Sequence, residues 1–334
     1  MIGQQAGDIE RKTVAILKAL SESPFPLGGK VLARRLSDQG INLGERAVRY
    51  HLRLTDERGL TRTIGKRYGR SITNLGLEEV NSALVNDRVG LVLTKINSIA
   101  YQSSFKTEVK SGTLPINVSL FPADQFNQAK EAMKDTFHSK VSLSDLVAVA
   151  TEGKKLGEVI VPPGKIGMAT VSHTVVCAAL IREGIPVDSR FGGTVQIRNR
   201  QPLRFVDLIE YGGCSIDPAG VFIASRMTSV GQAAREGNGR ILASFCEIPA
   251  LALTKAEATI KMLVAAGVNG LIKIGRINEP VCEIPVEMGK VGIMLSDGLN
   301  PVAAAVEAGS EVINIMMSGV IDFGRLGSFW NLER

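Results

Sequence analysis

Hydrophobic residues recur every three or four positions through the first sixty residues of the chain, which is the spacing of amphipathic helices. The pattern predicts helices over residues 8–21, 30–39 and 45–58. Asp8 is a suitable N-cap for the first helix, and Gly59 ends the third. Prolines and paired glycines separate the first helix from the second. The expected order is three short helices joined by tight connections.

The third helix carries an apolar stripe on one side and cationic side chains on the other. Val48, Leu52 and Thr55 recur at i, i+4 and i+7, so we expect them to face the core. The residues left to face outward are Arg46, Arg49, Tyr50 and Arg53. Two helices joined by a short turn, the later one presenting arginines, form a helix-turn-helix, in which such arginines suit guanine edges in the major groove.

Two β-prone runs follow, at residues 60–64 and 71–73, on either side of a basic tip. They predict a β-hairpin, the wing of a winged helix-turn-helix. The cationic residues expected to contact phosphates or the minor groove here are Arg62, Lys66, Arg67 and Arg70. The alternative is a basic three-helix module for protein interaction. The helix stripe and the wing together favour DNA over this alternative.

The charge distribution agrees with a nucleic-acid-binding N-terminus. Residues 1–75 carry 14 Lys and Arg against 7 Asp and Glu, whereas the whole chain of 334 residues carries 39 against 33. The basic excess therefore lies in the first quarter of the chain, and the remainder is nearly neutral. A basic module attached to a neutral one fits an electrostatic footprint for a phosphate backbone.

Composition excludes several other classes of protein. No stretch of 18 apolar residues is long enough for a membrane span, and charged residues interrupt any apolar run near the N-terminus. The four cysteines are far apart and form no CxxC pair, which speaks against a zinc finger or a disulfide framework. We therefore expect a cytoplasmic protein with reduced cysteines, no metal site and no membrane association.

The chain length favours two or three domains. We assign residues 1–75 to the winged helix-turn-helix, residues 76–100 to a helical connector, and residues 101–334 to a regulatory domain. The helical stretch from Leu75 to about Ala100 suits either a connector that also forms a dimer interface or an ordinary helix packed on its own domain.

From residue 101 apolar strand runs alternate with helices, which predicts an α/β (α+β) regulatory domain of one or two subdomains. Strands are expected at 114–121, 145–151, 156–161, 240–246, 270–274, 281–286, 290–295 and 311–316, and helices at 122–138, 171–183, 255–266 and 300–308. The later part approximates a βαββαβ order, in which antiparallel and parallel strands share one sheet with helices on a face.

A polar, glycine-rich region lies between these two parts of the domain. Paired glycines allow close backbone approach, and their N–H groups can hold a carboxylate or phosphate. The residues expected to bind an anionic effector are Thr170, Ser172, His173, Arg190, Gly192, Gly193, Gly213 and Ser215. The alternatives are tight turns between strands for the glycines and a structural role for His173. Residues 231–239 suit a loop over a cleft or a plain surface loop.

The chain resembles the NrpR-type nitrogen regulators of methanogenic archaea over nearly its whole length. The matching strings are residues 44–52, 56–61 and 69–73 in the N-terminal part, and residues 184–193, 242–250 and 298–301 in the larger part. The resemblance implies a homo-oligomeric repressor, a dimer or tetramer, of nitrogen-assimilation genes. It also implies binding to an inverted-repeat operator, relieved by 2-oxoglutarate held between subdomains by Arg190 and by backbone and hydroxyl donors.

An enzyme with an appended nucleic-acid-binding module is the second hypothesis. It requires a convergent acid/base or nucleophile set or clustered metal-binding carboxylates, and the sequence presents none of these, nor a GxGxxG or GxxxxGK[ST] motif. The sequence therefore predicts a regulator without catalytic residues or cofactor.

Overall fold

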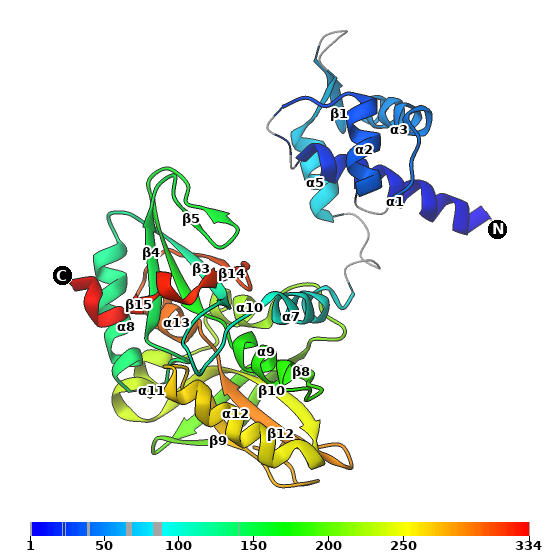
Figure 1. Ribbon diagram of the computed structural model, residues 1–334. Helices are drawn as coiled ribbons and strands as arrows, with labels where there is room; N and C mark the ends of the chain where they lie inside the picture. The colour runs from blue at the N-terminus through cyan, green and yellow to red at the C-terminus, as the bar shows by residue number, and fades with distance from the viewer. Residues whose placement is uncertain are drawn as a thin grey trace. The chain divides into compact units, whose positions relative to one another are not determined.

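The computed structural model describes residues 2–21, 23, 25–38, 41–64, 69–82, 89–139 and 141–333. The chain divides into two compact units, Met1–Arg88 and Val89–Arg334 (Figure 1). This division falls inside the segment 76–100. Helix α5 (Asn74–Ser82) belongs to the first unit and helix α7 (Leu91–Gln102) to the second.

Three helices, a β-hairpin and α5 form the N-terminal unit. The other elements are α1 (Ile2–Ser21), α2 (Gly29–Asp38), α3 (Glu45–Glu57) and the antiparallel pair β1 (Thr61–Thr63) and β2 (Arg70–Ile72). Helix α3 buries Val48, Leu52 and Thr55, which the hydrophobic spacing assigns to the core. The winged helix-turn-helix is thereby confirmed, while the wing tip at residues 65–68 lies outside the described residues.

Strands and helices alternate through the second unit. The strands are β3 (Thr113–Pro122), β4 (Leu146–Thr151), β5 (Lys155–Leu156), β6 (Val159–Ile160), β7 (Lys165–Val171), β8 (Asp188–Arg198), β9 (Gln201–Glu210), β10 (Gly239–Pro249), β11 (Leu271–Ile274), β12 (Lys290–Ser296), β13 (Ile313–Ile315), β14 (Val320–Asp322) and β15 (Gly327–Ser328). The helices after α7 are α8 (Phe126–His138), α9 (Thr174–Arg182), α10 (Pro218–Ala224), α11 (Val230–Glu236), α12 (Leu253–Ala265) and α13 (Asn300–Glu307).

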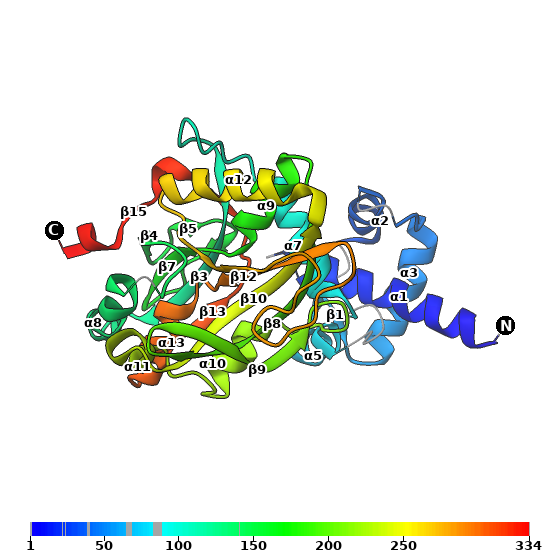
Figure 2. The same cartoon turned by 90° about the horizontal axis from the view of Figure 1, so that it is seen from below.

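Two sheets organise this unit. One has the strand order β13-β3-β7-β4-β15, with β14 also paired to β3, and the other has the order β11-β12-β10-β8-β9. Helices α9 and α12 cover one face of the second sheet, and α10, α11 and α13 lie on its other side (Figure 2). The α+β class expected from the sequence is confirmed.

Every pairing between the described strands is antiparallel, so strands that run parallel share a sheet, as expected, but none of them are hydrogen-bonded neighbours. The crossover β3–α8–β4 does bring two strands parallel, but β7 lies between them. Strand β12 separates β10 and β11 in the same way. The last expected strand, β13, then joins the other sheet by pairing with β3.

Four local predictions are also corrected. Residues 281–286 form an isolated bridge between Val281 and Ile284 instead of a strand, and residues 156–161 are split between β5 and β6. The Gly192-Gly193 pair lies within β8, where a Cβ would strike neighbouring residues, so close packing and not a turn requires these glycines. Residues 231–239 are largely helix α11 and the start of β10, because Ala233 and Ala234 are buried.

Residues of both sheets share the largest hydrophobic cluster. Phe121 and Met168 of the first sheet and Phe245 and Met294 of the second belong to it, together with residues of α8, α11 and α13. Cys246, next to Phe245, faces the opposite side and packs with α9 and α12. The second sheet is therefore buried on both faces. Within the described residues, no helix has the length and apolar composition of a membrane span.

Candidate functional site

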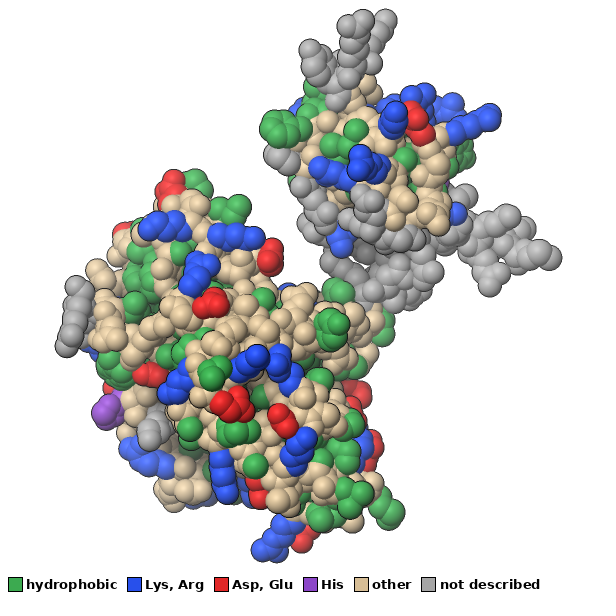
Figure 3. All heavy atoms as spheres, viewed as in Figure 1, with side chains coloured by type: hydrophobic (Ala, Val, Ile, Leu, Met, Phe, Trp, Pro, Cys, Tyr) green, Lys and Arg blue, Asp and Glu red, His purple; other side chains and the backbone are tan. Residues whose placement is uncertain are grey.

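Helix α3 presents its cationic face to solvent. Arg46, Arg49, Tyr50 and Arg53 are all exposed, as the sequence predicts. Arg49 pairs with Glu45 of the preceding turn at 2.6 Å, and the Arg53 guanidinium lies 5.7 Å from the centre of the Tyr50 ring. Exposed pairs of this kind contribute little to stability, so these arginines are available to exchange a weak partner for a phosphate or a base. Figure 3 shows Lys and Arg side chains gathered on the visible face of this unit.

Arg70 has a different role from the other predicted DNA-binding residues. Its Nε donates to Asp56 Oδ2 at 2.6 Å, and Asp56 Oδ1 accepts from the Thr61 hydroxyl at 2.6 Å. Asp56 at the end of α3 therefore holds both strands of the wing, a role that the sequence analysis did not assign. Arg62 on β1 is exposed and suits a phosphate contact. Lys66 and Arg67 lie outside the described residues.

A buried polar group lies where β7 ends and α9 begins. The Thr170 hydroxyl is buried without a hydrogen-bond partner in the described structure. Ser172 is bonded to the Thr174 hydroxyl at 3.1 Å. His173 Nδ1 lies 3.2 Å from Asp297 Oδ2, but the two groups are not aligned for a hydrogen bond. Thr170, Ser172 and His173, three of the expected effector-binding residues, are thus brought together at one place.

The loop between β9 and α10 completes this group from another part of the chain. The Tyr211 ring lies nearly parallel to the His173 ring, with 6.5 Å between centroids and 12° between planes. Asp217 caps α10 by accepting from the Ala219 N–H at 2.9 Å. Gly192 of β8 allows close approach, because a Cβ there would strike Tyr211 and Pro218. We call the group formed by Thr170, His173, Tyr211, Asp217 and Asp297 the junction site.

One buried cation and two carboxyl groups give the junction site an unusual electrostatic balance. Burial alone would lower the pKa of His173, but its interaction with Asp297 outweighs burial and raises that pKa to about 9. Burial, with the charge of Asp297, raises the pKa of Asp217 to about 6, against the opposing charge of His173. At neutral pH the site therefore holds a buried imidazolium cation next to two carboxylates.

The loop from β12 to α13 closes the other side of the junction site. Gly298 follows Asp297, and a Cβ at this position would overlap the carbonyl oxygen of Val171 at the end of β7. Asn117 of β3 accepts from the Met317 N–H at 2.9 Å, and Met317 has a positive φ of 48°. Strained non-glycine residues cluster at ligand sites, which agrees with the unpartnered polar atoms nearby.

Arg190, which we expected to hold the effector, is already engaged in ion pairs. Its Nη1 lies 2.9 Å from Glu247 Oε2 and 2.6 Å from Glu287 Oε1. Lys290 pairs with the same two glutamates and with Asp188. The three carboxylates lie close enough together for a metal ion, but the two cations already neutralise most of their charge.

The remaining predicted effector residues fall in two places. Gly213 and Ser215 are exposed on the loop between Tyr211 and Asp217, next to the junction site. Gly193 instead lies against Asp207 and Phe205 of β9. Sequence reasoning missed Tyr211, Asp217 and Asp297. The Asp217-Pro218 pair was a detectable signal, because Asp at the N-cap followed by Pro at the first position starts helices.

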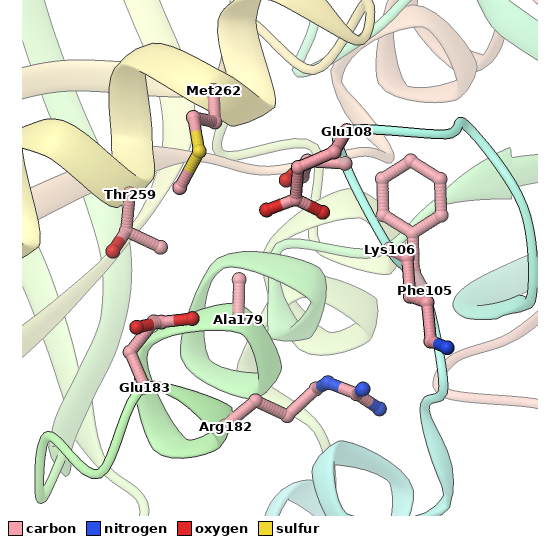
Figure 4. A pocket seen from close by; sticks show the side chains of 9 residues that line it. Phe105, Lys106, Glu108, Ala179, Arg182, Glu183, Thr259 and Met262 are labelled. Atoms are coloured by element: carbon pink, nitrogen blue, oxygen red, sulfur yellow. The ribbon is translucent and has the colours of Figure 1, made fainter.

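A separate pocket lies between α9, α12 and residues 105–108 (Figure 4). Its Arg182 donates to the Ser103 carbonyl at 3.2 Å, and its Glu183 pairs with Lys255 at 3.1 Å. Figure 4 shows the carboxylates of Glu108 and Glu183 together with the guanidinium of Arg182 around the pocket, and Lys106 also lines it. The pocket therefore carries as many cationic as anionic side chains.

A winged helix-turn-helix with exposed arginines, followed by an α+β unit with a buried polar site, is the organisation of a ligand-responsive transcription regulator. Comparisons with known proteins agree. The family model described as NrpR regulatory domains NRD1 and 2 matches residues 89–328, and the Ribonuclease R winged-helix domain model matches residues 14–80.

Curated relatives cover nearly all of the chain. It is 38% identical over 315 residues to the global nitrogen regulator NrpRI of Methanosarcina mazei, covering 94% of this chain and 97% of the relative. The global nitrogen regulator NrpR of Methanococcus maripaludis is 31% identical over 89% of this chain, and that of Methanocaldococcus jannaschii is 30% identical over 98%. The chain spans only 51% and 56% of those two longer relatives.

A solved structure of a nitrogen repressor-like protein from Methanococcus jannaschii shares the fold, with a TM-score of 0.61 and 22% identity. The match covers 71% of this chain and 98% of that one. The chain belongs to the NrpR family, and the resemblance noted in the sequence is confirmed. Its relatives are named as regulators and not as enzymes.

The different settings of Arg53 and Arg70 predict different mutant phenotypes. Arg53→Ala should weaken binding to specific DNA by about tenfold without changing the melting temperature, because it removes an exposed contact only. Arg70→Ala should lower the free energy of unfolding of the N-terminal unit by about 1 kcal/mol, because Asp56 loses its partner. Fluorescence anisotropy and thermal melts measure the two effects.

The control for both variants is Arg198→Ala, which removes an exposed arginine of the second unit. It should change neither quantity. Wild-type DNA affinity in Arg53→Ala would show that the outer face of α3 is not the recognition surface.

Proposed function

We propose that the chain is a homo-oligomeric repressor of nitrogen-assimilation genes that binds an inverted-repeat operator and is released from it by 2-oxoglutarate bound at the junction site. The names of its relatives and the winged helix support the regulatory role. The effector and the sign of the response are our inference from the site and the family.

The observation that carries the effector proposal is the Thr170 hydroxyl, which is buried without a hydrogen-bond partner in the described structure and precedes the charged His173 by three residues. A buried hydroxyl or ring nitrogen without a partner costs about 1–3 kcal/mol, so such atoms are rare unless a ligand or ordered water satisfies them. Thr170 belongs to the strand that leads into His173, whose imidazole is a cation at neutral pH. A small anion that offers several acceptor oxygens can accept hydrogen bonds from the Thr170 hydroxyl and from the imidazolium, whose charge Asp297 and Asp217 otherwise balance.

The proposed regulation follows from thermodynamic linkage. An effector changes DNA affinity only if it binds the DNA-competent and DNA-incompetent arrangements with different affinities. A tenfold change in operator affinity requires a difference of only ~1.4 kcal/mol. One charge-assisted hydrogen bond from His173 that forms in a single arrangement is sufficient.

The function is tested by fluorescence anisotropy with an inverted-repeat DNA from the promoter of a nitrogen-assimilation gene, titrated with 2-oxoglutarate at fixed salt. Tight, sequence-selective binding that weakens at least tenfold with the effector is the expected result. Selective binding that ignores 2-oxoglutarate would retain the regulator and reject the effector. An absence of selective binding would reject the repressor itself.

Thr170→Val locates the effector site in the same assay. The substitution keeps the side-chain volume but removes an unpartnered hydroxyl, so it should leave thermal stability unchanged or raise it while lowering 2-oxoglutarate affinity about tenfold. Thr259→Val is the matched control, because the Thr259 hydroxyl is also buried but bonds to the Lys255 carbonyl on α12. It should lower stability and leave effector affinity intact. Wild-type effector affinity in Thr170→Val would place the effector elsewhere.

Effector affinity should also fall in two steps as pH rises. Above about pH 6 Asp217 becomes negatively charged, and above about pH 9 His173 loses its positive charge. The other titratable groups that interact with Asp217 are Asp297, Tyr211, Cys214 and Lys95. The effector carboxylates stay ionised throughout this range, since carboxyl groups titrate near pH 4. Isothermal titration calorimetry from about pH 5 to 10 measures both steps.

Asp217→Asn should remove the fall in effector affinity near pH 6 and keep the fall near pH 9. A pH-independent affinity in the wild-type chain would show that neither group contacts the effector.

A further inference from the structure

Helix α7 is the first element of the second unit along the chain, so the covalent path from the DNA-binding unit enters the regulatory unit through it (Figure 1). Its inner face is formed by Val92, Ile96 and Ile99. These residues share one hydrophobic cluster with Tyr211 and Met317. The helix therefore packs directly on Tyr211, which belongs to the junction site, and on Met317.

Tyr211 contacts both His173 of the junction site and the inner face of helix α7. It is only 3% exposed, and its ring is nearly parallel to that of His173. Its backbone N–H donates to the Arg190 carbonyl at 2.9 Å, which ties the residue to β8. Close-packed interiors have few voids. If the His173 ring shifts, Tyr211 must therefore follow it or a cavity must open between the two rings.

A second connection joins α7 to the same region. Lys95 Nζ donates to the Met316 carbonyl at 2.8 Å, and the next residue, Met317, is held by Asn117. Burial lowers the pKa of Lys95, while the negative charge of Asp217 opposes that change. A change of charge at Asp217 therefore changes the electrostatic energy of the Lys95 ammonium group on α7.

We infer that Tyr211 is a positioning residue that couples the junction site to α7, and that α7 carries effector occupancy to the DNA-binding unit. This inference rests on the proposed function, because it assigns the route by which the same effector acts. The effector changes the surroundings of His173, Tyr211 follows the imidazole ring, and α7 shifts with Tyr211. The start of α7 sets where the chain leaves for the DNA-binding unit, so its shift alters how two copies engage the half-sites.

The test uses the full chain and separates effector binding from its consequence. Ile96→Ala loosens the packing of α7 against Tyr211 and leaves every side chain of the junction site in place, and Ile260→Ala makes the same change in a buried position of α12. For each variant, calorimetry gives the 2-oxoglutarate affinity. Anisotropy gives the ratio of operator dissociation constants with and without effector.

The expected result is specific to one variant. Ile96→Ala should bind 2-oxoglutarate within about threefold of wild type, while its operator ratio falls from at least tenfold to near onefold. Ile260→Ala should keep both quantities. A wild-type ratio in Ile96→Ala, or an equal loss in Ile260→Ala, would overturn the role of α7 and leave the proposed function standing. A wild-type chain that does not respond to 2-oxoglutarate would overturn both.

If Ile96→Ala does not fold, substitutions of Tyr211 test the coupling between the junction site and α7. Tyr211→Phe keeps the ring beside His173 and should preserve the operator ratio. Tyr211→Leu keeps apolar contact with α7 but removes the ring, and should reduce the ratio at least fivefold more than it reduces effector affinity. An unchanged ratio in Tyr211→Leu would contradict the coupling.

Discussion

A charged histidine buried in the protein interior must be neutralised locally, and this requirement organises the regulatory unit around His173. Burying an unpaired charge costs several kcal/mol, and Asp297 is the carboxylate that compensates for it. The two residues are more than a hundred positions apart, on the β7–α9 and β12–α13 connections. Their pairing joins an end of one sheet to an end of the other, and Tyr211 packs against the same imidazole. The site thus depends on the register of both sheets.

Ion pairing has two different uses in this chain. In the N-terminal unit, Asp56 holds the wing through Arg70, while the exposed arginines of α3 remain on the surface. In the regulatory unit, Arg190 and Lys290 neutralise a cluster of three carboxylates. Arg190 is therefore already neutralised by carboxylates, although its position beside the glycine pair in the sequence suggested a ligand.

The sequence predicted the N-terminal unit well because its determinants are local. The spacing of Val48, Leu52 and Thr55 sets both the buried and the exposed face of α3. It misjudged β8, because Gly192 and Gly193 commonly mark turns and only tertiary neighbours reveal that they permit close packing. Thr170, Ser172 and His173 could be proposed together from the sequence because they are close neighbours along the chain. Tyr211 and Asp297 could not be found in that way, since the fold alone brings them to His173.

Hydrogen–deuterium exchange of the full chain, with and without saturating 2-oxoglutarate, tests the central claim most directly. That claim is that the effector binds at His173 and that α7 responds. The account predicts slower exchange at residues 166–182 and 211–218, a changed rate in α7, and no change in α12. Protection confined to other segments, or protection at the site with α7 unchanged, would contradict it.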